Sequence, residues 1–567
     1  MVSPFLFLKP VFCFCHRQSI NFPAKSFKLN RTARMLTKTN SYEDLITRFS
    51  WNIPPQYNIA EDICDKWADG TGKTALIYER EDLSTRAFSF DQIKSLSNKL
   101  ANAMAAAGVQ RGDRIGVLLP QKPEVAIGHL AAFKLGAISV PLFTLFGRDA
   151  LRFRLKDSGI KLLITDLEGY EVVELIRGEL PELKHIVCID GAVGTAIDFQ
   201  SMLEVASDEL TVAPTSCDDP AMIIYTSGTT GDPKGALLPH RSMLGHMPGV
   251  ELSHDFLGQD GDFIWSPADW AWIGGLIDVL FAAWQLGVPV LARRFQKFDP
   301  VEAAHLIARH GVKNVFMPPT AIKLLRTLPA KDFKGVKLRS MASGGESLGA
   351  ELLNWSTETL GIEINEFYGQ TECNMTVSGC SGLYKIKPGS IGRVAPGHHI
   401  GIIDESGIRL PTGEDGLIAF ESPNPVMFTK YWNNEQGTTD KFIGKFLVTG
   451  DLGRIDDEGY VTFLGRQDDV ITSAGYRIGP GPIEDCLLSH PSVALSAVVG
   501  KSDPMRTQIV KAFVVLKEGA KASDALVQEL QEWVRSRLAK HEYPREIEFI
   551  SDLPRTNTGK VIRRLLR

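Results

Sequence analysis

The stretch of sequence best suited to chemistry is residues 223–240, IIYTSGTTGDPKGALLPH, where an apolar run enters a loop of glycines, hydroxyl side chains and one lysine. Gly228 and Gly231 permit positive φ angles, which lets successive backbone N–H groups turn toward a bound anion. The side chains that add donors or positive charge are Thr226, Ser227, Thr229, Thr230 and Lys234. Together these features predict a site for the phosphates of a nucleotide.

Two other kinds of glycine-rich segment fit this sequence less well. An ordinary surface loop has the same composition, but such loops rarely follow a buried strand and carry a lysine at this offset. A Walker A loop is excluded here because Pro233 precedes Lys234. The segment GTGKT at 70–74 is also excluded, because Trp67 stands where the first glycine is required and a predicted strand follows.

Composition restricts the class of protein. The chain has 567 residues, is 44% hydrophobic and has a net charge of −5, which predicts several folded domains and no nucleic-acid partner. Since no apolar run approaches about 18 residues, we expect no transmembrane helix. The eight cysteines lack regular spacing and CxxC pairs, which favours a reducing, cytoplasmic compartment. The sequence does not indicate an oligomeric state.

Residues 1–40 differ from the rest of the chain. They contain several lysines and arginines, and no acidic residue precedes Glu43. This pattern is typical of an organellar, for example mitochondrial, transit peptide, but it also fits a disordered leader or a start of translation at Met35. Residues 1–40 are therefore excluded from the predicted fold.

The phosphate loop is predicted to lie at the end of a strand in an α/β domain. Apolar runs predict strands at 114–120, 138–142, 161–166, 185–190, 221–227 and 313–319, with helices at 123–137 and 301–311. This alternation predicts doubly wound sheets, which bind ligands at the carboxyl ends of their strands. A small β-barrel-like region is expected at about 390–465. The region after it is predicted to be a small α+β domain with a helix over 524–542.

Three further motifs follow the glycine-rich loop: NEFYGQTECN at 365–374, TGDLGRIDDEGYVTFLGRQDDVITSAGYRIGP at 449–480 and PRTNTGK at 554–560. In this order and spacing they resemble the AMP-forming acyl-CoA synthetases of the adenylate-forming superfamily, which also contains firefly luciferase. The resemblance covers residue 41 to the end. It implies a large AMP-binding domain over 41–467 and a small mobile domain over 468–567.

The resemblance also implies a reaction and its participants. A carboxylate attacks the α-phosphate of ATP, pyrophosphate leaves, and the acyl-adenylate then passes its acyl group to coenzyme A. Thr371 would donate to the α-phosphate, and Glu372 would bind Mg²⁺. The nucleotide would be held by Gly345, Glu346 and Ser347, by Glu366, Phe367, Tyr368, Gly369 and Gln370, and by Asp451, Arg466 and Arg477. Tyr368 would lie beside the adenine, and Asp451 would accept hydrogen bonds from the ribose hydroxyls.

The same resemblance gives the small domain two tasks. Lys560 would bridge the carboxylate and the α-phosphate during adenylation, and Gly475 would line the tunnel for the pantetheine thiol. The domain would turn about a hinge at Asp468 between these two steps. Cys373, beside Glu372, is interpreted as a structural thiol because this chemistry needs no enzyme-bound intermediate.

The acyl group is predicted from two glycines. Acetate-specific relatives have valine and tryptophan where this chain has Gly344 and Gly369, while Trp270 and Trp272 would form the remaining apolar wall. This predicts a short- to medium-chain fatty acid or an aryl acid. Alternatives are an acetyl- or propionyl-CoA synthetase, an adenylating enzyme with a carrier-protein acceptor, and a non-catalytic acyl- or nucleotide-sensing module.

Overall fold

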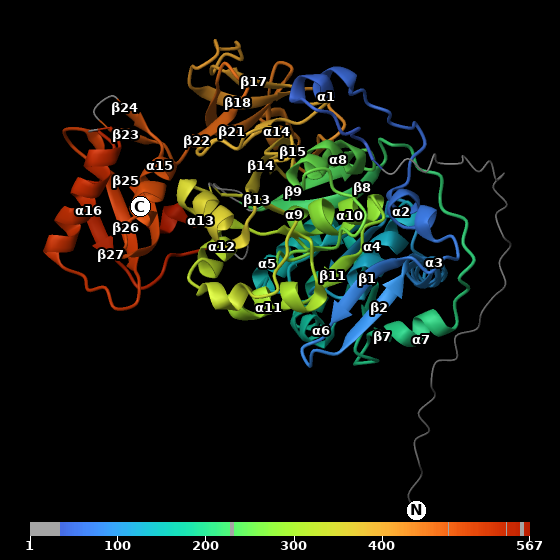
Figure 1. Ribbon diagram of the computed structural model, residues 1–567. Helices are drawn as coiled ribbons and strands as arrows, with labels where there is room; N and C mark the ends of the chain where they lie inside the picture. Colours follow the sequence, from blue (N-terminus) through green and yellow to red (C-terminus); the bar gives the residue numbers. More distant parts are fainter. Residues whose placement is uncertain (1–33, 227–231, 347, 474–475, 540, 556–560) are drawn as a thin grey trace, which may run out of the picture. The chain divides into compact units, whose positions relative to one another are not determined.

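The structure is a computed structural model that describes residues 34–226, 232–346, 348–473, 476–539, 541–555 and 561–567. Residues 32–567 form one compact unit. Four sheets organise the described residues (Figure 1). The predicted mixed α/β class with a smaller C-terminal α+β part is confirmed.

The two large sheets are mostly parallel. One has nine strands in the order β16-β15-β14-β13-β12-β10-β11-β1-β2, and the other has eight in the order β19-β9-β8-β4-β3-β5-β6-β7. The strands of the first are β1 Thr74–Glu79, β2 Thr85–Ser89, β10 Ile264–Trp265, β11 Val290–Ala292, β12 Asn314–Phe316, β13 Ser340–Gly344, β14 Ile364–Gln370, β15 Cys373–Ser378 and β16 Arg393–Val394. Those of the second are β3 Arg114–Leu118, β4 Ile138–Pro141, β5 Ile160–Thr165, β6 His185–Cys188, β7 Ile197–Asp198, β8 Pro220–Thr226, β9 Lys234–Pro239 and β19 Lys430–Tyr431.

The two smaller sheets have five strands each. One is an antiparallel sheet of β17 Ile400–Ile403, β18 Gly416–Glu421, β20 Phe442–Ile443, β21 Phe446–Ile455 and β22 Val461–Arg466. The other consists of β23 Ile471–Ser473, β24 Tyr476–Ile478, β25 Val493–Asp503, β26 Thr507–Leu516 and β27 Glu546–Phe549. The division of domains at residue 468 stays a prediction.

Helices flank the sheets (Figure 1). They are α1 Tyr42–Arg48, α2 Ile59–Ile63, α3 Phe90–Ala106, α4 Pro123–Lys134, α5 Arg148–Ser158, α6 Leu167–Glu174, α7 Phe199–Glu204, α8 Ser242–Ser253, α9 Ile273–Gly275, α10 Ala282–Gln285, α11 Pro300–His310, α12 Pro319–Leu325, α13 Ala350–Leu360, α14 Glu435–Thr439, α15 Pro480–Leu488 and α16 Asp524–Arg537. A π-helix over Leu276–Phe281 joins α9 to α10, and 3₁₀ turns occupy Asp65–Trp67, Arg177–Glu179, Ala330–Phe333 and Arg563–Leu565. The helix predicted over 524–542 ends earlier, at Arg537.

Burial on both faces explains the continuous apolar strands of the large sheets. In β5, Leu162 and Ile164 belong to the main core, whereas Leu163 belongs to a second cluster with residues of α5 and α6. Adjacent side chains of a strand point to opposite faces, so both faces of this sheet are covered. A third cluster packs α11, α12 and α13 on the first sheet. The predicted doubly wound arrangement follows from this packing.

The packed structure begins earlier than the sequence predicted. Leu36 is buried in a cluster with Leu45, Leu252, Phe256, Cys380 and Ala395. The backbone N–H groups of Met35 and Leu36 donate to the carboxylate of the buried Glu251, at 2.7 and 3.2 Å. Met35 and Leu36, which the sequence assigned to the excluded segment of about 40 residues, therefore pack against the folded chain, and the end of the predicted leader stays a prediction.

Candidate active site

The glycine-rich loop connects two paired strands. Thr226 ends β8 and Lys234 begins β9, and the two residues are partners in an antiparallel ladder. The hydroxyl group of Thr226 donates to the carbonyl of Lys234 at 3.3 Å. Because β8 also runs parallel to β4, the loop leaves the sheet at a carboxyl strand end, as predicted.

Lys234 and Glu372 meet through a tyrosine that no motif indicated. The ammonium group of Lys234 lies 5.2 Å from the centre of the Tyr431 ring, and the Tyr431 hydroxyl donates to Glu372 Oε1. Tyr431 is held in place because β19 pairs with β9, where Tyr431 lies opposite Ala236. A cation over an aromatic face is favourable, so Tyr431 contacts both charged groups. Two motifs far apart in sequence are thus joined at one place.

Thr371 and Glu372 form the turn between β14 and β15. β14 runs parallel to β13, so this turn and the segment after Gly344 leave the same edge of the sheet. Gly345 has a φ of +98°, a conformation that favours glycine. Glu346 follows it, and Thr320 donates to its carboxylate at 3.2 Å. The structure therefore brings these two predicted segments together.

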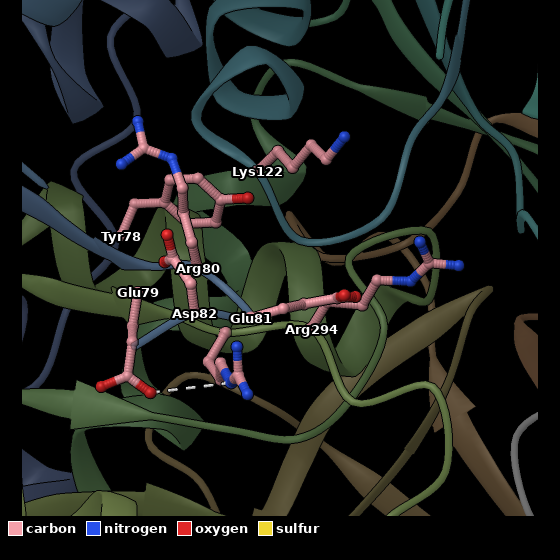
Figure 2. A pocket seen from close by; sticks show the side chains of 8 residues that line it. Tyr78, Glu79, Arg80, Glu81, Asp82, Lys122 and Arg294 are labelled. Carbon is pink, nitrogen blue, oxygen red and sulfur yellow. Dashed lines mark ion pairs between the residues drawn. The ribbon is translucent and has the colours of Figure 1, made fainter. Parts of the chain in front are cut away.

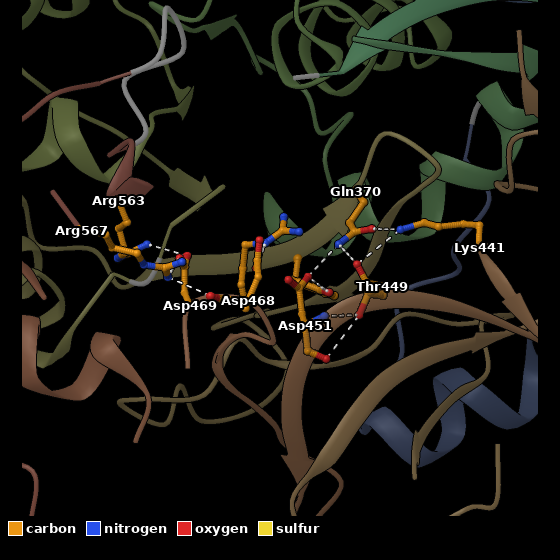
Figure 3. Close-up of polar contacts among 10 residues, drawn as sticks. Gln370, Lys441, Thr449, Asp451, Asp468, Asp469, Arg563 and Arg567 are labelled. Atoms are coloured by element: carbon orange, nitrogen blue, oxygen red, sulfur yellow. Dashed lines mark hydrogen bonds and ion pairs between the residues drawn. The ribbon is translucent and has the colours of Figure 1, made fainter. Parts of the chain in front are cut away.

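Asp451 is the centre of a polar network next to this turn (Figure 3). It lies on β21 and is 4% exposed. Tyr368 Oη donates to Asp451 Oδ2 at 2.5 Å, and Gln370 Nε2 donates to the same oxygen at 2.8 Å. Burial raises the pKa of the Asp451 carboxyl group. Both of these hydrogen bonds use Oδ2, and no hydrogen bond to Oδ1 occurs among the described residues.

The ring of Tyr368 is packed between two phenylalanines. Its centroid lies 6.3 Å from that of Phe420 and 6.2 Å from that of Phe463. Burial, together with the charge of Asp451, raises the pKa of the Tyr368 hydroxyl, which therefore stays protonated as a donor. The structure gives Tyr368 a role toward Asp451, and its predicted place beside adenine stays a prediction.

Arg466 and Asp468 form the link toward the C-terminal part. Arg466 is the partner of Asp451 in the β21–β22 ladder, and its Nε donates to Asp468 Oδ1 at 3.1 Å. The backbone carbonyl of Asp468 accepts from Arg567 Nη2 at 2.8 Å. Asp469 pairs with Arg567 at 2.6 Å and with Arg563 at 3.4 Å (Figure 3).

The acyl-side residues lie among packed aromatic rings. Trp270 is 1% exposed, and the ring of Trp272 lies 5.7 Å from that of Phe316. A Cβ atom at Gly344 would come within 2.7 Å of the Phe367 ring, and one at Gly369 within 2.5 Å of Asn374 Cα. A side chain at either glycine would therefore clash with these neighbours, and the acyl pocket predicted beside the two glycines stays a prediction.

Two other predicted residues are buried. Burial, aided by Asp485, raises the pKa of the Glu366 carboxyl group to about 8. Burial and the charge of Glu372 raise the pKa of the Cys373 thiol, so this cysteine is protonated and unreactive. The latter supports the structural role that was predicted for Cys373.

Some predicted site residues lie outside the described residues. These are Ser227, Gly228, Thr229, Thr230, Gly231, Ser347, Gly475 and Lys560. Arg477 lies on the short strand β24. The roles predicted for these residues stay predictions.

A cavity of about 420 Å³ lies at a different place, and none of the predicted site residues lines it (Figure 2). Its wall includes Glu79 at the end of β1, Lys122 before α4, and Arg293 and Arg294 after β11. Glu79 is 1% exposed and forms an ion pair with Arg309 at 2.8 Å. His310 also contacts Glu79, at 2.6 Å.

Sequence reasoning missed two residues of the candidate site, Tyr431 and Lys441. Lys441 Nζ donates to Gln370 Oε1 at 3.0 Å and to the carbonyl of Thr449 at 3.3 Å (Figure 3). Neither residue belongs to a local pattern that indicates chemistry. Both reach the site through contacts that only the folded chain creates.

Carboxyl strand ends, a glycine-rich loop with its lysine, and an acidic residue held by neutral donors define the class of α/β enzymes that use a nucleotide. The chain belongs to the AMP-binding enzyme family, which matches residues 64–432. The AMP-binding enzyme C-terminal domain matches residues 482–560. The resemblance inferred from the motifs is thereby confirmed.

Named relatives resemble the chain over nearly its whole length. The mitochondrial acyl-coenzyme A synthetase ACSM3 of Rattus norvegicus is 34% identical over 98% of this chain and 97% of its own. The mitochondrial acyl-coenzyme A synthetase ACSM4 of Homo sapiens is 36% identical over 92% of each chain.

Solved structures give the same family. The anthranilate CoA ligase AuaEII, in complex with anthranoyl-AMP, has a TM-score of 0.84 at 29% identity, covering 91% of this chain and 97% of that one. An acyl-CoA synthetase of Brucella canis has a TM-score of 0.73 at 33% identity, covering 93% and 98%. Among the described residues, no helix is both long and apolar enough to cross a membrane.

Proposed function

We propose that this protein activates a carboxylic acid with ATP and then transfers the acyl group to coenzyme A. In the first step a carboxylate oxygen bonds to the α-phosphorus of ATP while the bond to the bridging oxygen breaks and pyrophosphate leaves. In the second step the thiol sulfur bonds to the acyl carbon, AMP leaves, and the thiol proton passes to solvent. The products are acyl-CoA, AMP and pyrophosphate.

The observation that carries this proposal is the meeting of three motifs at one place. Lys234 contacts Tyr431, which donates to Glu372, and Gln370, the last residue of β14 before this turn, donates to Asp451. A cation from the phosphate loop, a carboxylate and a ribose acceptor are thus arranged along one path. Phosphoryl chemistry depends mainly on such positioning and on neutralising the developing charge.

The residues take the following roles in the proposal. The glycine-rich loop with Lys234 binds the outer phosphates, Thr371 donates to the α-phosphate, and Asp451 orients the ribose. Lys560 supplies a positive charge to the carboxylate and the α-phosphate. The small domain turns about Asp468 so that Gly475 can face the incoming thiol.

Glu372 is suited to Mg²⁺. Its Oε1 accepts from Tyr431, which leaves Oε2 for a metal, and no group of three or more acidic, histidine or cysteine ligands occurs among the described residues. Mg²⁺ commonly binds through one carboxylate together with phosphate oxygens and water, so the donor set fits. The ion would neutralise phosphate charge, while Tyr431 fixes the orientation of the Glu372 carboxylate.

The acid is proposed to be a short- to medium-chain fatty acid or an aryl acid rather than acetate. Phe316 lies against both Trp272 and Phe367, and Trp270 is buried, which supports an apolar or aromatic acyl group. The proteins similar to this chain include an acyl-coenzyme A synthetase and an anthranilate CoA ligase. A preference for acetate over hexanoate and benzoate in a screen by pyrophosphate release would reject this part of the proposal.

Acid-dependent exchange of pyrophosphate into ATP tests the first step. We expect exchange with the parent protein and its loss in Lys560→Ala, because the charge at the reacting atoms is removed. Exchange by Lys560→Ala at the parent rate would contradict the proposal. A protein that binds ATP and acid without exchange would be a sensing module.

The acceptor is tested separately. AMP release should require coenzyme A, and analysis of the products should show acyl-CoA. If coenzyme A does not increase AMP release but an acyl carrier protein does, the carrier protein is the acceptor.

The compartment is also part of the proposal. The named relatives are mitochondrial, which supports the mitochondrial alternative over the cytoplasmic one. Fluorescent fusions of the full chain and of residues 35–567 would distinguish the two, because only the full chain should reach mitochondria. Cytoplasmic fluorescence of both would contradict the mitochondrial location.

A further inference from the structure

Lys441 is a positively charged residue inside the candidate nucleotide site. It lies between α14 and β20, and its backbone is fixed from two sides. Val448 N donates to the Lys441 carbonyl at 2.8 Å, and Lys441 N donates to the carbonyl of Thr438 at 3.2 Å. The side chain then reaches Gln370 Oε1 at 3.0 Å. Ordering a long flexible side chain costs conformational entropy, and the contacts of Lys441 must offset this free-energy cost.

Lys441 completes the hydrogen bonds of the Gln370 amide. An ammonium group only donates, so Lys441 requires the amide oxygen to face it. The amide nitrogen then faces two acceptors, Asp451 Oδ2 at 2.8 Å and the carbonyl of Thr449 at 2.9 Å. Lysine, amide and carboxylate therefore form one directed chain of hydrogen bonds that ends on the proposed ribose acceptor.

Lys441 also contributes charge to this region. The charged groups that face it are the carboxylates of Glu372 and Asp451 and the cations Arg466 and Lys234. Burial lowers the pKa of Lys441, and the two carboxylates oppose this effect. In return, the ammonium group favours the ionised form of Asp451, whose pKa is raised by burial. Geometry and charge thus act in the same direction on Asp451.

We propose that Lys441 is a positioning residue that acts through Gln370 to orient the Asp451 carboxylate for the ribose hydroxyls of ATP. This inference rests on the proposed use of ATP and adds a residue that the motifs do not contain. Lys441 does not itself touch the reacting atoms. Because Gln370 directly precedes Thr371, the same contact links the ribose acceptor to the turn that carries Thr371 and Glu372.

Comparing ATP with 2′-deoxy-ATP tests this role in Lys441→Met, which keeps the length of the side chain but removes its charge and donors. For ATP we expect kcat/KM to fall about tenfold, the usual size for a charge-assisted hydrogen bond. The loss with 2′-deoxy-ATP should be smaller. The ratio of kcat/KM for ATP to kcat/KM for 2′-deoxy-ATP should therefore be lower in Lys441→Met than in the parent protein. Equal losses with both nucleotides would overturn the proposal, because a merely structural residue would weaken both.

The pH dependence gives a second readout. Arg466, the hydrogen bonds from Tyr368 and Gln370, and the Lys441 ammonium group all lower the pKa of Asp451 against the effect of burial. Removing the ammonium group therefore raises this pKa, and less of the ionised form remains at a given acidic pH. When kcat/KM for ATP is measured against pH, its fall on the acidic side (the acidic limb) should therefore occur at higher pH in Lys441→Met than in the parent protein. An unmoved limb would contradict the proposal.

Two variants serve as controls. Lys441→Arg keeps the charge and a donor, and should retain most of the preference for ATP. Lys445→Met removes an exposed lysine between β20 and β21 that pairs with Glu421, and should match the parent protein in both readouts. If Lys441→Met folds poorly, Lys441→Gln against Lys441→Arg makes the same comparison, because only the arginine retains the charge.

Equilibrium binding of ATP and 2′-deoxy-ATP separates this inference from the proposed function. A parent protein without acid-dependent exchange would refute the proposed function, yet binding could still show the narrowed preference in Lys441→Met. Normal exchange with an unchanged preference would refute the role of Lys441 alone.

Discussion

Glu79 and Asp451 are two buried carboxylates with different surroundings. Glu79 is 1% exposed and has ion pairs with Arg309 at 2.8 Å, His310 at 2.6 Å and Arg293 at 3.6 Å. Asp451 is 4% exposed, yet its side-chain hydrogen bonds within the described residues come from the neutral groups of Tyr368 and Gln370.

Their pKa values change in opposite directions. Burial alone would raise the pKa of Glu79, but hydrogen bonds from Arg309 and His310 outweigh it and lower the pKa. Burial raises the pKa of Asp451. The first carboxylate has enough cationic partners for a structural role, and the second has room for further donors. The partners of the two carboxylates therefore indicate a structural role for Glu79 and a binding role for Asp451.

The largest expected effect is on stability, in Glu79→Gln. This change removes the buried carboxylate that Arg293, Arg309 and His310 share, and costs about 3–5 kcal/mol. The thermal midpoint should fall clearly, while kcat/KM for ATP in the folded protein stays near the parent value. Glu302→Gln is the matched control, because Glu302 also pairs with Arg309 but is more exposed. Equal midpoints for the two variants would contradict the comparison.

The next effect is on ATP use, in Asp451→Asn. The variant loses the charge that accepts the ribose hydroxyls, and we expect kcat/KM for ATP to fall about 100-fold, a loss typical of a buried charged contact. The thermal midpoint should stay near that of the parent protein, since a poorly compensated charge is removed. Steady-state kinetics and thermal unfolding of the same preparation check both points. A large drop in the thermal midpoint with unchanged kcat/KM for ATP would instead make Asp451 a structural charge like Glu79.

The smallest effect is expected for Tyr431→Phe. This change removes the hydroxyl that fixes Glu372 but keeps the ring near Lys234, so about 1 kcal/mol should be lost. The Mg²⁺ concentration needed for half-maximal exchange should rise a few-fold. Tyr460→Phe removes a hydroxyl that donates to the carbonyl of Lys385 at 2.7 Å, and serves as the control. The same Mg²⁺ requirement in both variants would argue against a role for Tyr431.

Much of the fold could be predicted because local patterns and the final packing agree. The run KLLITD predicted a strand, and alternate residues of β5 are indeed buried on opposite faces. The C-terminal helix was predicted too long. It ends where Leu538 becomes extended, and Ala539 N then donates to Glu542 Oε2 at 2.8 Å. A local hydrogen bond of this kind competes with the helix, and periodicity does not reveal it.

The candidate site was predicted as far as its motifs extend. Motifs indicated Lys234, Glu372 and Asp451, but not Tyr431 and Lys441, which join them. Lys441 and Gln370 are 71 residues apart, and both side chains also donate to the carbonyl of Thr449 on β21, so the folded chain brings them together. Gly344 and Gly369 were predicted to leave space for the acyl group, and the structure adds a second reason for glycine, because a Cβ there would clash with Phe367 or Asn374.

Asp468, the predicted hinge, makes two contacts with arginine side chains, and water could take the place of either arginine. Its side chain pairs with Arg466 and its carbonyl accepts from Arg567, while these residues remain partly accessible to solvent. Exposed charged contacts contribute little and weaken as salt screens them. A backbone rotation at this residue would therefore meet a shallow barrier from these contacts, and ionic strength would tune how readily the chain turns there.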